Sequence, residues 1–211
     1  METPVAAGPF GSWLAKARAS LRGEAGNDVP CGDCVGCCTS SYYIPLRPSD
    51  AATLEKVPAT YLTKSQQPPD GTWMMGYKAN GHCPMFDGKG CSVYKARPQT
   101  CRDYDCRIFA AAAIAAGGAE KDAINRRVRA WIFTYADGAE RSLHAAVKRA
   151  ADFISGNIEK FPAGFTPATS MAIAVLAIKV YPLFKDHDPA PINAVELITA
   201  IVAASQIFDR S

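Results

Sequence analysis

The stretch CGDCVGCC at residues 31–38 places four thiols within eight residues. Thiolates at such close spacing favour soft or borderline metal ions, among them zinc and iron. Residues 107–211 contain no cysteine, so all the thiols are concentrated in the first half of the chain. All eight cysteines of the chain are candidate metal ligands: Cys31, Cys34, Cys37, Cys38, Cys83, Cys91, Cys101 and Cys106.

The spacing of these cysteines fits two kinds of metal centre. A structural zinc site takes four tetrahedral ligands, so eight thiols would fill two such sites. A Cys-x2-Cys-x2-Cys run with a remote Cys-Pro is similar to the ligand pattern of ferredoxins, which hold a 4Fe–4S cluster. Here residues 31–37 supply the run and Cys83-Pro84 the remote ligand. The sequence therefore predicts zinc or iron in one or two sites, and the spacing alone does not choose between them.

The start of the chain and its hydropathy bear on the compartment. Residues 1–22 have Glu2 and no long apolar run, so we expect no secretory signal. The most apolar stretch, residues 171–183, is interrupted by Lys179 and is too short to span a bilayer. We therefore expect a cytoplasmic protein without a membrane span. In a reducing cytoplasm, clustered cysteines indicate metal or redox chemistry more than a disulfide framework.

Composition and charge set limits on the partners. Hydrophobic residues make up 48% of the 211 residues, enough for a core that needs no cross-links. The formal net charge of +3 is mild, and we expect no nucleic-acid partner. The basic run at residues 126–129, which is followed by aromatic residues, is interpreted as a solvated helix face, with contact to an acidic ligand or RNA as the alternative.

Turn and hydrophobic patterns divide the chain into three segments. Residues 1–30 form an N-terminal amphipathic helix and a linker, and the helix either packs on the domain or docks on a membrane surface or partner. Residues 31–110 form a loop-rich metal-binding module, and residues 111–211 form a helical region packed on it. One face of the first helix gathers the apolar residues Phe10, Trp13, Leu14, Ala17 and Leu21. The predicted fold class is α+β and mainly helical, with a C-terminal helical bundle.

Shorter elements follow from local composition. In the module we expect strands at residues 41–46 and 72–78, a short helix at 49–55 and a turn at 66–71. Asp87-Gly88 and Lys89-Gly90 predict a tight hairpin that brings Cys83 and Cys91 together. Pro98 opens a helix that carries Cys101 and either ends before Cys106 or places it at another site. Five further helices are predicted at residues 108–116, 121–135, 139–154, 167–183 and 191–208.

Taken in order, these motifs resemble the CxxCxxCC cysteine-cluster family over residues 28–110. The run at residues 31–38 is followed by Cys83-Pro84 and then by the string CSVYKARPQTCR at residues 91–102. The resemblance implies a domain that chelates zinc or iron through these cysteines. A similar cluster occurs in a flagellin lysine methylase, where an iron–sulfur role and methyl transfer from S-adenosylmethionine are proposed. The resemblance therefore also raises an enzyme as an alternative.

The leading functional hypothesis is a metal-binding protein, with the helical region covering the module or presenting it to a protein partner. The alternatives are an iron–sulfur enzyme for redox or methyl-transfer chemistry, and a thiol redox switch that uses the vicinal Cys37 and Cys38. No Walker loop, dinucleotide fingerprint, nucleophile elbow or HExxH motif is present, so the sequence assigns no catalytic residue. His82 is interpreted as a polar neighbour of the thiols, and Arg97 and Arg102 as donors to sulfur or as surface arginines.

Overall fold

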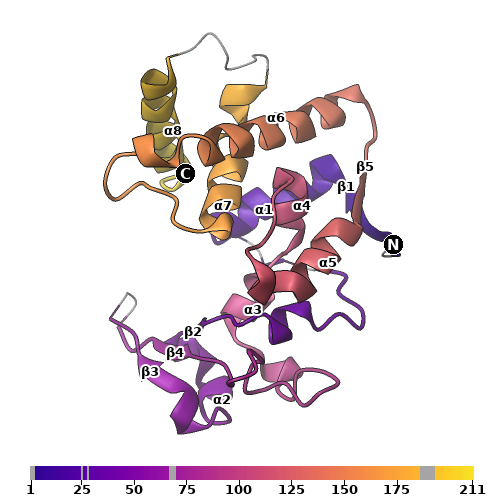
Figure 1. Ribbon diagram of the computed structural model, residues 1–211, viewed down its shortest axis with the longest axis vertical. Coiled ribbons are helices and arrows are strands. Elements are labelled where there is room, and N and C mark those ends of the chain that lie inside the picture. The colour runs from indigo at the N-terminus through magenta and orange to yellow at the C-terminus, as the bar shows by residue number, and fades with distance from the viewer. Residues whose placement is uncertain (1–2, 25, 28, 67–69, 186–192) are drawn as a thin grey trace. The chain divides into compact units, whose positions relative to one another are not determined.

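A computed structural model describes residues 3–24, 26–27, 29–66, 70–185 and 193–211 of the chain. Within these residues the chain forms eight α-helices and five strands (Figure 1). The strands form one two-stranded and one three-stranded sheet. The predicted fold class, α+β and mainly helical, is confirmed. None of the helices in the described part of the chain combines the length and the apolar character needed to cross a bilayer.

The chain divides into two compact units. The helical unit comprises Met1–Ala25, Cys106–Ala116 and Val128–Ser211, and the cysteine unit comprises Gly26–Asp105 and Gly117–Arg127. This partition groups the N-terminal segment with the C-terminal helices. It also adds residues 117–127 to the part of the chain that contains seven of the eight cysteines.

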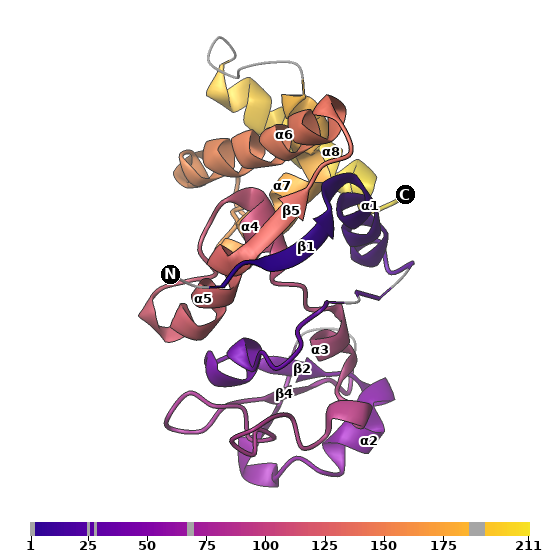
Figure 2. The same cartoon turned by 90° about the vertical axis from the view of Figure 1, so that its right-hand side faces the viewer.

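The helical unit begins with a strand that sequence reasoning missed. Strand β1, Val5–Pro9, pairs in parallel with β5, Trp131–Thr134, and the two lie side by side in Figure 2. The expected helix over residues 121–135 is wrong in its last part, because α5 spans Asp122–Ala130 and the strand follows at once. Buried and exposed residues alternate along β5, the period-two pattern of a strand with one covered face. Its aromatic and β-branched residues suit such a surface.

The N-terminal amphipathic helix is confirmed as α1, Phe10–Leu21. Its buried face contains four of the predicted residues, Phe10, Trp13, Leu14 and Ala17. Phe10 is fully buried, meets the ring of Phe133 edge-on at 5.1 Å and stacks on His144 at 4.2 Å between centroids. These aromatic contacts attach the helix to β5 and α6.

Four more helices complete this unit: α4 at Arg107–Ala112, α6 at Gly138–Ser155, α7 at Ser170–Val180 and α8 at Ala194–Phe208. Helix α4 ends before the predicted Ala116 because Ala113 adopts a left-handed backbone with φ of 57°. The start predicted for the last helix, residues 191–192, lies outside the described residues. Helix α6 packs on α4 and α7. Fully buried alanines such as Ala146, Ala150, Ala174 and Ala177 let these helices approach closely.

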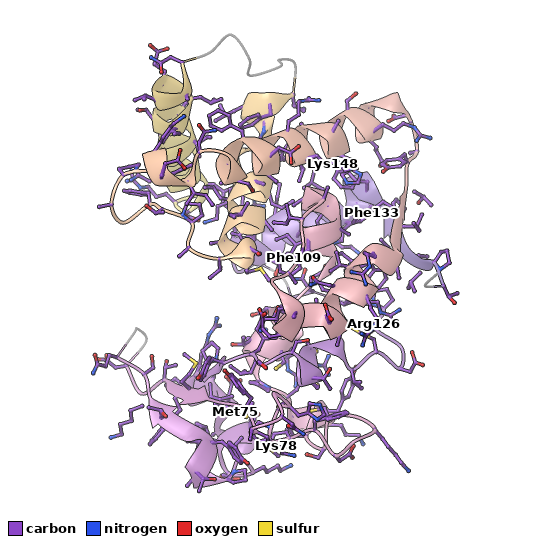
Figure 3. The ribbon with its side chains drawn as sticks, viewed as in Figure 1. Met75, Lys78, Phe109, Arg126, Phe133 and Lys148 are labelled. Carbon is purple, nitrogen blue, oxygen red and sulfur yellow. The ribbon has the colours of Figure 1, made fainter. Side chains whose placement is uncertain are left out.

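The cysteine unit is built on the sheet order β2-β4-β3, with β2 at Ile44–Leu46, β4 at Trp73–Met75 and β3 at Leu62–Lys64, all antiparallel. Strands β2 and β4 are shorter than predicted, and β3 was missed. The short helix α2, Ala51–Leu54, confirms the predicted helix at 49–55. Part of the turn predicted at 66–71, residues 67–69, lies outside the described residues. Leu46, Val57 and Met75 form a small apolar cluster. Figure 3 labels Met75 in this unit, and Phe109 and Phe133 in the helical unit.

The N-terminus of α6 provides a direct test of the helical unit. The Asp137 side chain accepts a hydrogen bond of 2.9 Å from the Glu140 N–H and so caps the helix. Asp137→Ala should lower the free energy of unfolding by about 1 kcal/mol, because a backbone donor loses its partner. Urea denaturation followed by far-UV circular dichroism measures the change. Asp152→Ala on the exposed face of α6 is the matched control. An equal effect of the two substitutions would contradict the cap.

Candidate metal centre

The cysteine run folds into two consecutive tight turns. The Cys34 N–H donates to the Cys31 carbonyl at 3.0 Å, with Gly32 in the left-handed region at φ of 57°. A 3-10 helix at Gly36–Thr39 follows, and the Cys38 N–H donates to the Val35 carbonyl at 2.9 Å. The turns therefore keep the four thiols of residues 31–38 within a short length of chain.

A second segment of the cysteine unit, residues 117–127, packs against this run. Gly36 lies against the start of α5, so closely that a Cβ atom at this position would be 3.1 Å from the Ala123 carbonyl oxygen. The Arg127 guanidinium donates to the Cys31 carbonyl. Lys121 Nζ donates to the carbonyls of Ser40 and Ser41, which follow the run. This segment thus holds both ends of the run.

The predicted hairpin after Cys83 is confirmed. Phe86 and Cys91 form an antiparallel bridge, and the Asp87 side chain accepts 2.8 Å hydrogen bonds from the N–H groups of Lys89 and Gly90. These bonds stabilise the carboxylate and lower the pKa of Asp87. The Cys83 N–H donates to the Cys38 carbonyl at 2.7 Å, which joins the hairpin to the cysteine run.

Cys101 comes to the same unit on α3, Gln99–Asp103, which begins after Pro98 as predicted. The Gln99 N–H donates to Asp50 Oδ1 at 2.9 Å, and Thr100 Oγ1 donates to the Pro45 carbonyl at 2.8 Å. These two bonds fix the helix beside β2. The helix ends between Cys101 and Cys106, one of the two arrangements that the sequence left open.

Electrostatic interactions show which thiols lie near one another. Burial, followed by the nearby charges of Cys37, Cys83 and Cys91 in that order, raises the pKa of Cys101 to about 12. Burial is also the largest cause of the raised pKa values of Cys83 and Cys91, and Cys37 contributes to both. Four thiols, those of Cys37, Cys83, Cys91 and Cys101, therefore interact as one group.

The remaining thiols of the run adjoin this group through Cys37. Burial, followed by the charges of Cys37 and Cys34, raises the pKa of Cys31 to about 11, whereas Arg127 opposes the rise. A hydrogen bond with Cys38 is the largest cause of the raised pKa of Cys37, followed by burial. Cys37 thus connects the thiols of the run with those of the hairpin and of α3.

Two backbone donors suit this group to thiolate chemistry. The N–H of Met85 points to the sulfur of Cys83 and the N–H of Val93 to that of Cys91, and each lowers the pKa of its thiol against the effect of burial. Hydrogen bonds to sulfur stabilise the anionic ligand and orient it. The donor set, thiols with N–H groups directed at two of them, fits zinc or iron.

The thiols are near neighbours without forming a coordination polyhedron. Among the described residues, no three side chains of His, Cys, Asp or Glu converge closely enough to hold a metal ion. All eight cysteines lie in the described part of the chain, and all are free thiols. A metal centre built from these thiols would therefore need its ligands to move from the positions described.

Cys106 has a different environment. It belongs to the helical unit, where it is buried and accepts a 3.2 Å hydrogen bond from the indole N–H of Trp131. His82 packs edge-on against Phe86 at 5.4 Å and lies 3.4 Å from the Asn80 amide nitrogen through Nδ1.

The arginines named from the sequence bind backbone oxygen. Arg97 donates to the Tyr94 carbonyl, and Arg102 donates to the carbonyls of Arg97 and Lys95. The positive charge of Arg97 nevertheless opposes the rise in the pKa of Cys91 and Cys101. Sequence reasoning missed the roles of Gly36, Lys121 and Arg127. The basic run at residues 126–129 was the available signal, and within it Arg127 is half-buried whereas Arg126 is exposed.

Comparison with known families agrees with this site. Residues 30–125 match the model of the CxxCxxCC family, whose description reads "Putative zinc- or iron-chelating domain". Residues 30–125 are therefore similar to this family, and the resemblance noted in the sequence is confirmed for that part of the chain. The match extends beyond the last cysteine into α5, the helix that packs on Gly36. No curated protein and no solved structure matches the chain.

The close approach at Gly36 generates a prediction. Gly36→Ala should lower the stability of the cysteine unit by about 1–3 kcal/mol, because the new methyl group meets helix backbone that cannot rotate away. Denaturant unfolding of the metal-free protein measures the loss. Gly90→Ala is the matched control, since a Cβ atom there meets nothing within 4 Å. Equal stability of the two variants would contradict the packing of α5 on the run.

Proposed function

We propose that the cysteine unit binds zinc or iron through thiolates, with Cys37, Cys83, Cys91 and Cys101 as its first set of four ligands. One observation carries this proposal: the thiols of Cys83, Cys91 and Cys101 all interact with the charge of Cys37. These cysteines come from three separate elements, the run, the hairpin and α3. Their meeting in one unit is expected of a ligand set and not of scattered structural cysteines.

A bound cation would supply the positive charge that a group of thiolates needs. Several thiolates in close range repel one another, and a divalent ion offsets half of the charge of four thiolates and favours the deprotonated form of each ligand. Met85 and Val93 then keep their N–H donors on the sulfurs, and Arg127 holds the backbone of the run through the Cys31 carbonyl. Free energy gained from the metal becomes folding free energy of the unit, whose own apolar cluster is small.

The other three thiols of the cysteine unit, those of Cys31, Cys34 and Cys38, are the candidate ligands of a second centre or exchange with the first set. Both a zinc site and a 4Fe–4S cluster take four ligands, so either kind of centre suits the first set. Eight free thiols persist in a reducing compartment, and we place the protein in the cytoplasm on that ground. We expect a protein partner to bind the helical unit, and we expect no nucleic-acid partner.

A thiol redox switch is the second candidate function. The hydrogen bond between the vicinal Cys37 and Cys38 favours it. The raised pKa of Cys37 counts against it, because the reactive species is the thiolate, which becomes scarce as the pKa rises. Nothing in the described residues favours an iron–sulfur enzyme over a metal-binding protein.

Ligand variants test the first set. Cys91→Ser should weaken cobalt binding on the order of 100-fold, because one of four thiolates is lost. Titration with Co(II), read through the sulfur-to-metal absorption band, gives the affinity. Cys106→Ser is the comparison, as it changes the same atom in the other unit and keeps an acceptor for Trp131. Wild-type affinity in Cys91→Ser, or an equal loss in Cys106→Ser, would refute this ligand set.

The pKa values predict how metal affinity depends on pH. Cys31 and Cys101, with pKa values raised to about 11 and about 12, are protonated at neutral pH in the metal-free protein. Metal must displace these protons, so the apparent affinity should rise with pH, with up to about four protons released per site. Zinc titration by calorimetry in buffers of different ionisation enthalpy counts the protons. An affinity that stays constant between about pH 6 and 8 would argue against thiolate ligands.

A further inference from the structure

A pocket of about 270 Å³ lies in the helical unit, where the ends of α7 and α8 meet α1. Two basic side chains, Arg18 and Lys179, share its wall with apolar ones, among them Leu183, Ala204, Ile207 and Phe208. No cysteine lines this pocket, so none of the proposed metal ligands belongs to it.

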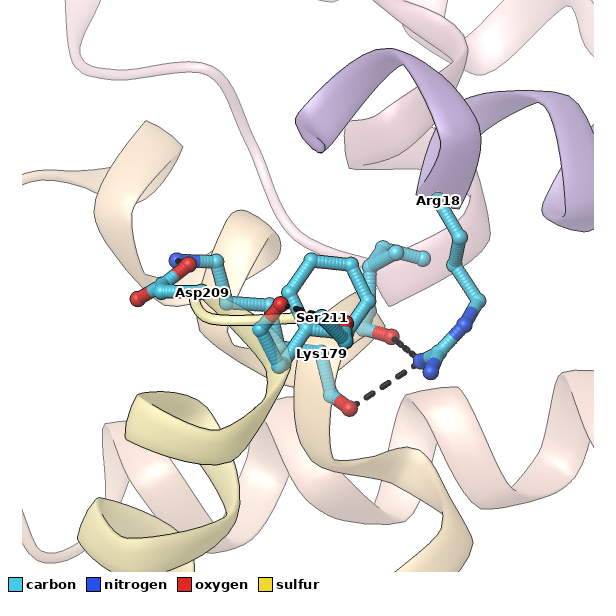
Figure 4. Close-up of polar contacts among 6 residues, drawn as sticks. Arg18, Lys179, Asp209 and Ser211 are labelled. Atoms are coloured by element: carbon cyan, nitrogen blue, oxygen red, sulfur yellow. Dashed lines mark hydrogen bonds and ion pairs between the residues drawn. The ribbon is translucent and has the colours of Figure 1, made fainter. Parts of the chain in front are cut away.

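Arg18 is fixed in place by backbone oxygen and aromatic rings. Its Nη1 donates to the carbonyls of Ile178 and Lys179 at 2.7 and 3.0 Å, at the C-terminal end of α7 (Figure 4). The guanidinium lies over the ring of Phe208, 4.6 Å from its centroid, and 5.3 Å from that of Tyr181. A planar cation fixed in this way is oriented in advance for a further acceptor.

Among the described residues, no acidic side chain forms an ion pair or a hydrogen bond with Arg18. The neighbouring cations already have partners, Lys179 with Asp209 at 2.5 Å and Arg22 with Glu24 at 2.5 Å. Burial lowers the pKa of Arg18, and the charge of Arg22 contributes to the decrease. A bound anion would relieve both effects.

Apart from Ser211 and the two basic residues, the residues that line the pocket are apolar. Ile207 is 68% exposed and Leu183 is 36% exposed, although both are large aliphatic residues. Helix α8 has a single charged residue, Glu196, in its whole length. An aliphatic group in the pocket would remove this apolar surface from water, which favours binding.

We propose that this pocket binds an aliphatic carboxylate of medium chain length, with the carboxylate on Arg18 and the chain between Ala204, Ile207 and Phe208. Arg18, which has no acidic partner among the described residues, favours a ligand with one negative charge, and the planar arrangement of its donors suits a carboxylate. The volume falls just below the roughly 300–1,000 Å³ of pockets for drug-sized ligands, so the chain is short.

Octanoate is the probe for this site. Titration of the full-length protein, followed by NMR chemical shifts, should show saturable binding of octanoate. Octanol and acetate should bind at least tenfold more weakly, because octanol lacks the carboxylate and acetate lacks the aliphatic chain. Arg18→Gln should weaken octanoate binding tenfold or more. Ala204→Phe should abolish it by filling the pocket without changing any charge.

Two controls keep the test decisive. Arg141→Gln removes another cation that stacks on an aromatic ring, Tyr135, at a position that does not line the pocket, and should bind octanoate as the wild type does. If Arg18→Gln does not fold, since Arg18 also caps α7, Ala204→Phe decides the outcome. The proposal is overturned if wild-type protein shows no saturable binding, if octanol binds as tightly as octanoate, or if Ala204→Phe retains the wild-type affinity.

Discussion

The burial of several thiols close to one another is the constraint on which the cysteine unit depends. Cys37 interacts with thiols from the run, from the hairpin and from α3, and every resolved shift in the group raises the pKa. Such a group cannot ionise fully unless a cation compensates it. The unit buries only a small apolar cluster around Leu46, Val57 and Met75. Its stability is therefore expected to depend on whatever cation the thiols bind, whereas the helical unit has an extensive core of its own.

Residues 117–127 give the cysteine run its shape. They hold its two ends through Arg127 and Lys121, and the absence of a side chain at Gly36 lets helix and run approach. Arg127 also provides one positive charge near Cys31, too little to balance a group of thiolates but enough to oppose the rise in its pKa. This packing gives a physical reason why the family match continues to residue 125, well past the last cysteine.

Local patterns predicted the features that depend on few residues. The spacing of the cysteines, the Asp87-Gly88 turn and the helix after Pro98 are all local signals, and each led to the right element. Features that depend on distant partners were missed. Strand β5 forms because β1, far away in the sequence, pairs with it, and the role of Gly36 depends on Ala123. The early end of α4 comes from the left-handed Ala113, which carries no glycine signal. The grouping of the cysteines by electrostatic contact is likewise a property of the folded chain.

The most direct test is the content of zinc, iron and acid-labile sulfide per chain in protein purified without oxygen and without a tag. The account predicts one or two equivalents of bound metal, either zinc without sulfide or iron with matching sulfide, and their loss when the thiols are alkylated under denaturing conditions. Protein that carries less than about a tenth of an equivalent of either metal, and that takes up none when zinc or iron is supplied to its reduced thiols, would contradict the account.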